Sequence, residues 1–233
     1  SGKQGDDQDS ASSKWTDGED DQDIEQLYEK YFDLALKLNI QNISTIKDGI
    51  ETINPTNLQN PKETIRIEKN KNELENTVYK IQYLITILNQ GEIPGYATEV
   101  IDYVPTGLKF NPADNPKWKM IEGRLVNKEL KNDIINPGES KTTTITLTWS
   151  EETENSKMMS NVAEIGQAAN NSNTPDINST PNNNNDKEND QDNSDIIIIK
   201  KEKNTKAIII ITIIAVLIVI IGGTIIIKKF VIK

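Results

Sequence analysis

The chain has 233 residues, and 26 Lys and Arg residues against 36 Asp and Glu residues give it a formal net charge of -10 at pH 7. This acidic excess repels a polyphosphate backbone, so nucleic acid is excluded as an expected partner. The chain has no Cys and no His, which excludes disulfides, thiol nucleophiles, His-dependent catalytic triads and the usual zinc sites.

The low hydrophobic fraction of 35% averages over segments of different character. Residues 1–27 are interpreted as an acidic linker and residues 28–168 as a folded domain with strand-like patterning. Residues 169–206, rich in Asn and Asp, are interpreted as a flexible linker. A membrane segment at 207–227 and a short basic tail at 228–233 complete the predicted organisation.

Apolar and polar residues alternate in several short segments of the patterned region, which is the period of a half-buried strand. Turn signals such as Asn136-Pro-Gly138 separate these segments. We therefore predict an all-β fold, an Ig-like antiparallel β-sandwich with Greek-key connections, and only a minor helix at residues 125–132. The predicted strands are 32–40, 79–87, 97–104, 141–149 and 159–165.

The segment from Ala207 to Ile227 contains no charged residue. At a rise of roughly 1.5 Å per residue it is long enough to span a hydrocarbon core of roughly 30 Å. Lysines flank it on both sides, which favours one C-terminal transmembrane helix over a buried core helix. Because the tail after it is short, we expect a single-pass protein of the cell membrane, with lipid as a partner and the large N-terminal part extracellular.

The chain begins without an apolar signal sequence, and we expect it to be the C-terminal part of a longer protein. The acidic motif at 17–23 (DGEDDQD) recurs at 186–192 (DKENDQD). This repeat predicts that the first residues end a preceding copy of the same module. Two unrelated acidic linkers are the alternative.

The stretch from Asn89 to Phe110 (NQGEIPGYATEVIDYVPTGLKF) resembles the Ig-like conserved-repeat domain of Gram-positive bacterial surface proteins. In that family a strand ending in Asn-x-Gly leads to a strand ending in Asp-x-x-Pro-x-Gly-Leu. Further matches in the family's order are FDLAL at 32–36, NPGESKTTTITLTW at 136–149, NVAEI at 161–165 and PDINSTPNN at 175–183.

The resemblance covers nearly everything from Trp15 to the membrane segment. It implies an Ig-like or pilin-like sandwich, often present in tandem, that raises other domains above the cell wall. Many relatives end in a sortase signal, but no LPxTG-type motif precedes the apolar segment of this chain. Anchoring is therefore expected to depend on the helix alone.

Some relatives in this broad group resemble pilins that close an internal isopeptide bond between Lys and Asn beside a buried acid. By position, the resemblance implies Lys37 as the nucleophile, Asn161 as the amide and Asp102 as the acid. In such a site, desolvation keeps the carboxyl protonated and removes the proton from the lysine. The alternation, however, directs Lys37 to solvent and Leu38 inward, so the alternative is an exposed lysine, an Asp that fixes the Pro turn and a hydrogen-bonded Asn.

Oxygen ligands for a loosely held Ca²⁺ ion are offered by Asp176, Asn178, Asp186 and Asp190. Their spacing lacks the glycine and the final Glu of an EF-hand loop, so a solvated linker without metal or cofactor is the preferred interpretation. No motif sets two carboxylates around a substrate cleft, and we expect no enzymatic activity.

Two functions remain for a non-enzymatic surface module. The first is a structural stalk or spacer repeat of a larger bacterial surface protein. The alternative is an adhesin module that binds a host or matrix protein or a glycan. The threonine-rich outer face presents no aromatic cluster typical of binding hot spots, which favours the stalk.

Overall fold

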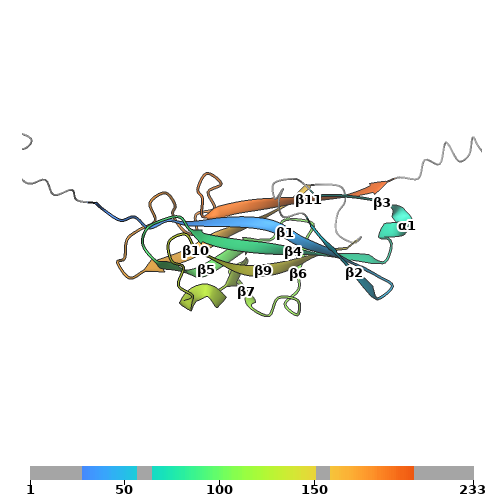
Figure 1. The fold of residues 1–233 in the computed structure, drawn as a ribbon. Helices are drawn as coiled ribbons and strands as arrows, with labels where there is room; N and C mark the ends of the chain where they lie inside the picture. Colours follow the sequence, from blue (N-terminus) through green and yellow to red (C-terminus); the bar gives the residue numbers. More distant parts are fainter. Residues whose placement is uncertain (1–27, 57–64, 151–157, 202–233) are drawn as a thin grey trace, which may run out of the picture. The chain divides into compact units, whose positions relative to one another are not determined.

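The computed structural model describes residues 28–56, 65–150 and 158–201 (Figure 1). The chain divides into two compact units, 1–30 and 31–233, and the strands given below belong to the second. The acidic linker at 1–27, the membrane segment from Ala207 to Ile227 and the basic tail lie outside the described residues. Within the described ranges, no helix is long and apolar enough to cross a membrane.

The strands form two sheets, ordered β2-β1-β4-β9-β6 and β3-β11-β10-β5-β8-β7. Helical structure in the described residues is confined to α1 (Lys71–Leu74) and a 3-10 turn (Glu129–Asn132). The strands are β1 Leu34–Lys47, β2 Ile50–Pro55, β3 Ile65–Asn70, β4 Thr77–Asn89, β5 Gly95–Tyr103, β6 Lys109–Phe110, β7 Trp118–Ile121, β8 Arg124–Asn127, β9 Ser140–Ser150, β10 Met158–Asn170 and β11 Gln191–Lys201.

The two sheets enclose one hydrophobic core, which confirms the predicted β-sandwich. In β4 every second side chain, from Thr77 onward, is buried, because only one face of the sheet meets the other sheet. Trp149 and Tyr83 are among the largest fully buried side chains. All five predicted strands lie within β1, β4, β5, β9 and β10, apart from Phe32, Asp33 and Val104 at their ends.

One pair of strands differs from the predicted antiparallel arrangement. The strands β3 and β11 are parallel, with Ile196 opposite Ile65. The difference arises because the chain passes from β2 in one sheet to β3 at the edge of the other sheet.

The helix predicted at residues 125–132 is wrong for its first half. Arg124–Asn127 is strand β8, which pairs with β5 on one side and β7 on the other. Leu125 and Val126 are both buried although they point to opposite faces. A strand with both faces covered lacks the alternation by which strands are recognised.

The flexible linker predicted at residues 169–206 is also wrong over the part that the structure describes, up to residue 201, and residues 202–206 lie outside it. The strand β10 extends to Asn170, residues 171–190 form a loop, and Gln191–Lys201 is strand β11. The run of β-branched isoleucines from 196 to 199 suits a strand, and Ile196 and Ile198 contribute to the core. The surrounding Asn and Asp residues obscured this strand in the sequence.

The turn after β4 explains the Asn-x-Gly motif at Asn89. The Asn89 Nδ2 donates to the carbonyl oxygens of Ile93 and Ile135, at 2.9 and 2.8 Å, and its Oδ1 accepts from the Gly91 N–H. A Cβ atom at Gly91 would lie only 2.6 Å from the backbone nitrogen of Asp33. The motif therefore holds a turn that has no room for a side chain at its glycine.

The first half of β1 has no partner in β2, which pairs only with residues 42–47. Acceptors from the β10–β11 loop and β11 take up three of its N–H groups instead. The bonds run from Leu34 N to Asp176 Oδ2 (2.9 Å), from Leu36 N to Asn189 O (2.8 Å) and from Leu38 N to Asp192 Oδ2 (3.0 Å). The partners of Leu34, Leu36 and Leu38 rise in number along the chain, and β1 and β11 run side by side in the same direction (Figure 1).

The buried and outward isoleucines of β11 offer a direct test of this strand. We expect Ile196→Ala to lower the free energy of unfolding by about 2–4 kcal/mol, because the substitution leaves a cavity in the core. The matched control Ile197→Ala, on the other face, should cost clearly less. Chemical denaturation measures both, and equal small losses would mean that this segment is not part of the core.

Candidate functional site

The most unusual polar group between the sheets is a carboxyl paired with an amide. Asp102 lies on β5 and Asn161 on β10, and both side chains are fully buried. The Asn161 Nδ2 donates to Asp102 Oδ2 at 2.7 Å. Asp102 is opposite Ala163 in the ladder, so Asn161, two residues away, is its diagonal neighbour on the inner face.

Burial dominates the electrostatics of this pair. It raises the pKa of Asp102 to about 7, although the hydrogen bond from Asn161 acts in the opposite direction. Tyr83, from the facing sheet, has a pKa raised well above its usual value by burial and, secondarily, by the charge of Asp102. The Oδ1 atoms of Asp102 and Asn161 and the Tyr83 hydroxyl have no hydrogen-bond partner. The site thus holds a carboxyl that is largely protonated below neutral pH.

The third residue of the isopeptide hypothesis, Lys37, lies elsewhere. Its side chain is exposed on β1, whereas the adjacent Leu38 is fully buried. No lysine is among the buried residues of the described part of the chain. The structure therefore brings the acid and the amide together without the nucleophile, and Asp102 faces the core instead of fixing the Pro turn.

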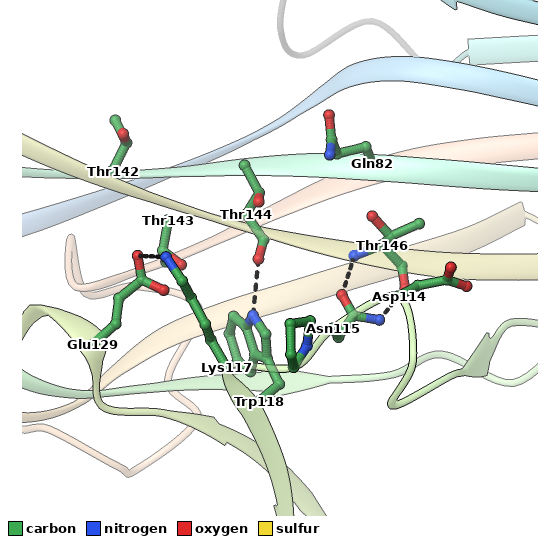
Figure 2. A pocket seen from close by; sticks show the side chains of 11 residues that line it. Gln82, Asp114, Asn115, Lys117, Trp118, Glu129, Thr142, Thr143, Thr144 and Thr146 are labelled. Carbon is green, nitrogen blue, oxygen red and sulfur yellow. Dashed lines mark hydrogen bonds and ion pairs between the residues drawn. The ribbon is translucent and has the colours of Figure 1, made fainter.

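A shallow hollow of about 290 Å³ lies beside β9 (Figure 2). Thr142, Thr144 and Thr146 of β9 line one side, and the segment from Asp114 to Trp118 lines the other. Figure 2 shows that the polar groups of Asn115 and Trp118 point at the β9 backbone, whereas Lys117 points at Glu129.

These polar groups are already paired with each other or with the strand. The Asn115 side chain accepts from Thr146 N at 2.7 Å and donates to Thr146 O at 2.8 Å, while Trp118 Nε1 donates to Thr144 O at 2.8 Å. The Lys117 Nζ lies 3.0 Å from Glu129 Oε1. Because β6 covers only two residues of β9, we interpret the segment as a cover for an otherwise open sheet edge.

The calcium candidates lie in the β10–β11 loop, in different environments. Asp176 accepts from the backbone of Leu34, Asn178 and Ser179, and Asp190 is only 2% exposed. Asn178 and Asp186 are exposed. In the part of the chain that the structure describes, no three acidic side chains converge closely enough to hold a metal by themselves.

Two buried polar residues near these sites were not predicted from the sequence. Tyr83 follows the apolar phase of β4, where a tyrosine is typical of a core position. Glu164, within NVAEI, is fully buried and accepts from the Tyr103 hydroxyl at 2.6 Å and from Asn183 N at 2.6 Å. A Glu between Ala163 and Ile165 in a strand was the available signal for a buried carboxylate.

Comparisons with known proteins do not assign a family. No family model matches the chain, and no curated protein matches it. Among solved structures, the solution structure of a CARDB domain from Pyrococcus furiosus matches with a TM-score of 0.35 and 12% identity, covering 74% of this chain and all of that one. The crystal structure of that CARDB domain in complex with di-metal ions matches with a TM-score of 0.34 and 12% identity, covering 75% of this chain and all of that one. These values are too low to assign the chain to that family.

The buried carboxyl of Asp102 makes stability depend on pH. Its pKa is about 7 in the folded state against an ordinary value of 3.8. As pH rises between these values the unfolded chain loses the proton and the folded chain keeps it, so the free energy of unfolding should fall by an amount on the order of a few kcal/mol.

We expect Asp102→Asn, which can still accept the Asn161 hydrogen bond, to remove the part of this fall that Asp102 contributes, while the part due to Asp190, whose pKa is also raised to about 7, remains. Denaturation at pH 4 and pH 8 measures it, with Asp186→Asn at an exposed position as the control. A pH dependence equal in Asp102→Asn and the unsubstituted protein would show that Asp102 does not titrate in this range.

Proposed function

We propose that the described sandwich is a structural spacer of a bacterial surface protein, held at the membrane by its C-terminal segment. The resemblance to Ig-like conserved-repeat domains motivates the cell-surface location, and the apolar segment from Ala207 to Ile227 motivates the anchor. The proposal assigns no catalysis to the domain.

The observation that carries the proposal is the course of the first and last strands. β1 and β11 lie side by side and run in the same direction, so the described chain enters the sandwich at one end and leaves at the opposite end (Figure 1). Strand β11 has 11 residues, which extend about 35 Å at roughly 3.3 Å per residue. Modules joined through such ends are lined up end to end, and each adds its length to the array.

The same arrangement suits a domain that transmits force. Tension on the two ends pulls β1 and β11 in opposite directions along their own lengths. Strand β1 pairs with β4 from Leu34 to Lys47, and β11 pairs with both β10 and β3. Hydrogen bonds loaded in this direction share the force and break together, which resists extension.

The surface of the domain supports the alternative function, adhesion, less than it supports the spacer. The hollow beside β9 is a natural candidate for a ligand, but the side chains of Asn115, Lys117 and Trp118 are occupied by the contacts described above. A ligand there would have to displace the bonds that cover the edge of β9. We therefore prefer the spacer.

Single-molecule extension of the full chain tests the proposal. With handles at Tyr31 and Lys201, we expect unfolding at a force several-fold higher than with handles at Lys47 and Glu75. The second pair pulls apart neighbouring ends of β1 and β4, so that their hydrogen bonds open one at a time.

Both pairs of handles pull on the same folded domain. A difference in unfolding force therefore reports the direction of pulling and not a difference in the free energy of unfolding. Equal unfolding forces in the two geometries would contradict a load-bearing role. Release of peptides from residues 65–150 by protease treatment of intact cells provides the separate test of the extracellular location.

A further inference from the structure

The loop between β10 and β11 gathers carboxylates against the start of β1. Asp176 and Glu188 lie in the loop, Asp190 lies at its end, and Glu164 reaches it from β10. The charges of Glu164, Glu188 and Asp176 all act on the Asp190 carboxyl, and Asp33 acts on Asp176. Like charges this close need donors or cations to compensate them.

Hydrogen bonds compensate four of these five carboxylates. Asp176 and Glu164 accept backbone N–H groups, and Asp33 accepts from Asn189 Nδ2 at 3.0 Å. Glu188 accepts from Thr180 N at 2.6 Å and from the side chains of two asparagines.

Asp190 is the exception. Its side chain is 2% exposed, and neither of its carboxylate oxygens accepts a hydrogen bond from another residue. The neighbouring Gln191 also has a buried side-chain oxygen without a donor. A buried carboxylate without any partner is costly, so it must hold either a proton or a cation.

No basic side chain fills this role in the described part of the chain. Arg124 bonds to Asn182, forms an ion pair with Glu122 and interacts with Tyr103, whose hydroxyl donates to Glu164. None of the ion pairs found among the described residues includes Asp33, Glu164, Asp176, Glu188 or Asp190.

We propose that the β10–β11 loop is a calcium site centred on Asp190. The carboxylate and amide side chains of the loop supply oxygen atoms as possible ligands. Ca²⁺ prefers six to eight oxygens in flexible geometry, including amide and backbone carbonyls. Since no three acidic side chains converge on one point here, neutral oxygens must complete the coordination. The buried side-chain oxygen of Gln191, next to Asp190 in the chain, has no donor and is one such neutral candidate.

A bound ion would fasten the β10–β11 loop to β1, because this loop already accepts the N–H groups of Leu34 and Leu36.

Titration calorimetry and thermal unfolding of the full chain, stripped of metal and then supplied with CaCl₂, test the site. A Ca²⁺ excess of about 100-fold over Kd should raise Tm by about 5–10 °C. Asp190→Asn should abolish the binding heat and the Tm shift. Asp133→Asn, the same isosteric change at an exposed position outside the loop, should keep both.

Folding of Asp190→Asn is not at risk, because the substitution removes a buried charge that has no partner. Its Tm without metal at pH 8 should equal or exceed that of the unsubstituted chain. Absence of any heat or Tm shift with CaCl₂ would overturn the proposal. Equal responses of the two variants, or an equal response to MgCl₂, would overturn it as well. The proposal is independent of the spacer function, which the extension experiment tests.

Discussion

The first strand of this sandwich depends on acceptors from the last segment of the domain. β2 covers only the second half of β1, and the first half would be an open edge without the bonds from Leu34, Leu36 and Leu38 to the β10–β11 loop and β11. Unpaired N–H groups at an edge are costly when buried and promote pairing with other chains when exposed. The β10–β11 loop and the start of β11 are rich in Asp and Asn. This composition has a structural role, because carboxylates and carbonyls accept hydrogen bonds from the free N–H groups of a strand edge.

The same contacts determine the mechanics of the module. By aligning the start of β11 with the start of β1, they set the two strands in the same direction and send the chain out at the far end of the sandwich. They also hold Asp176 against the start of β1, in the loop that ends at Asp190, whose buried carboxyl accepts no bond from another residue. The proposed calcium site and the proposed spacer both depend on the contacts between β1 and the β10–β11 segment. An experiment can nevertheless contradict one of the two proposals and leave the other standing.

The sequence predicts the central strands well, because one face of β4 and of β9 is buried and their residues alternate. It fails where this condition is absent. All six residues of β2 are exposed, β8 is covered on both faces, and four consecutive isoleucines in β11 hide the alternation. The resemblance selects Asp102, Asn161 and Lys37. Lys37 lies on the outer face, so the buried pair lacks the amine that an isopeptide bond requires. The isolation of Asp190 depends on three segments meeting in space, which no local pattern encodes.

The parallel course of β1 and β11 is the central claim, and the distance between two spin labels tests it most directly. The chain has no native Cys, so Lys37→Cys and Lys201→Cys carry the only labels. Residue 37 lies beside the start of the 11-residue strand β11, so we expect a narrow distribution near about 35 Å at roughly 3.3 Å per residue. A broad distribution, or a centre below about 20 Å at the same rise per residue, would contradict the account.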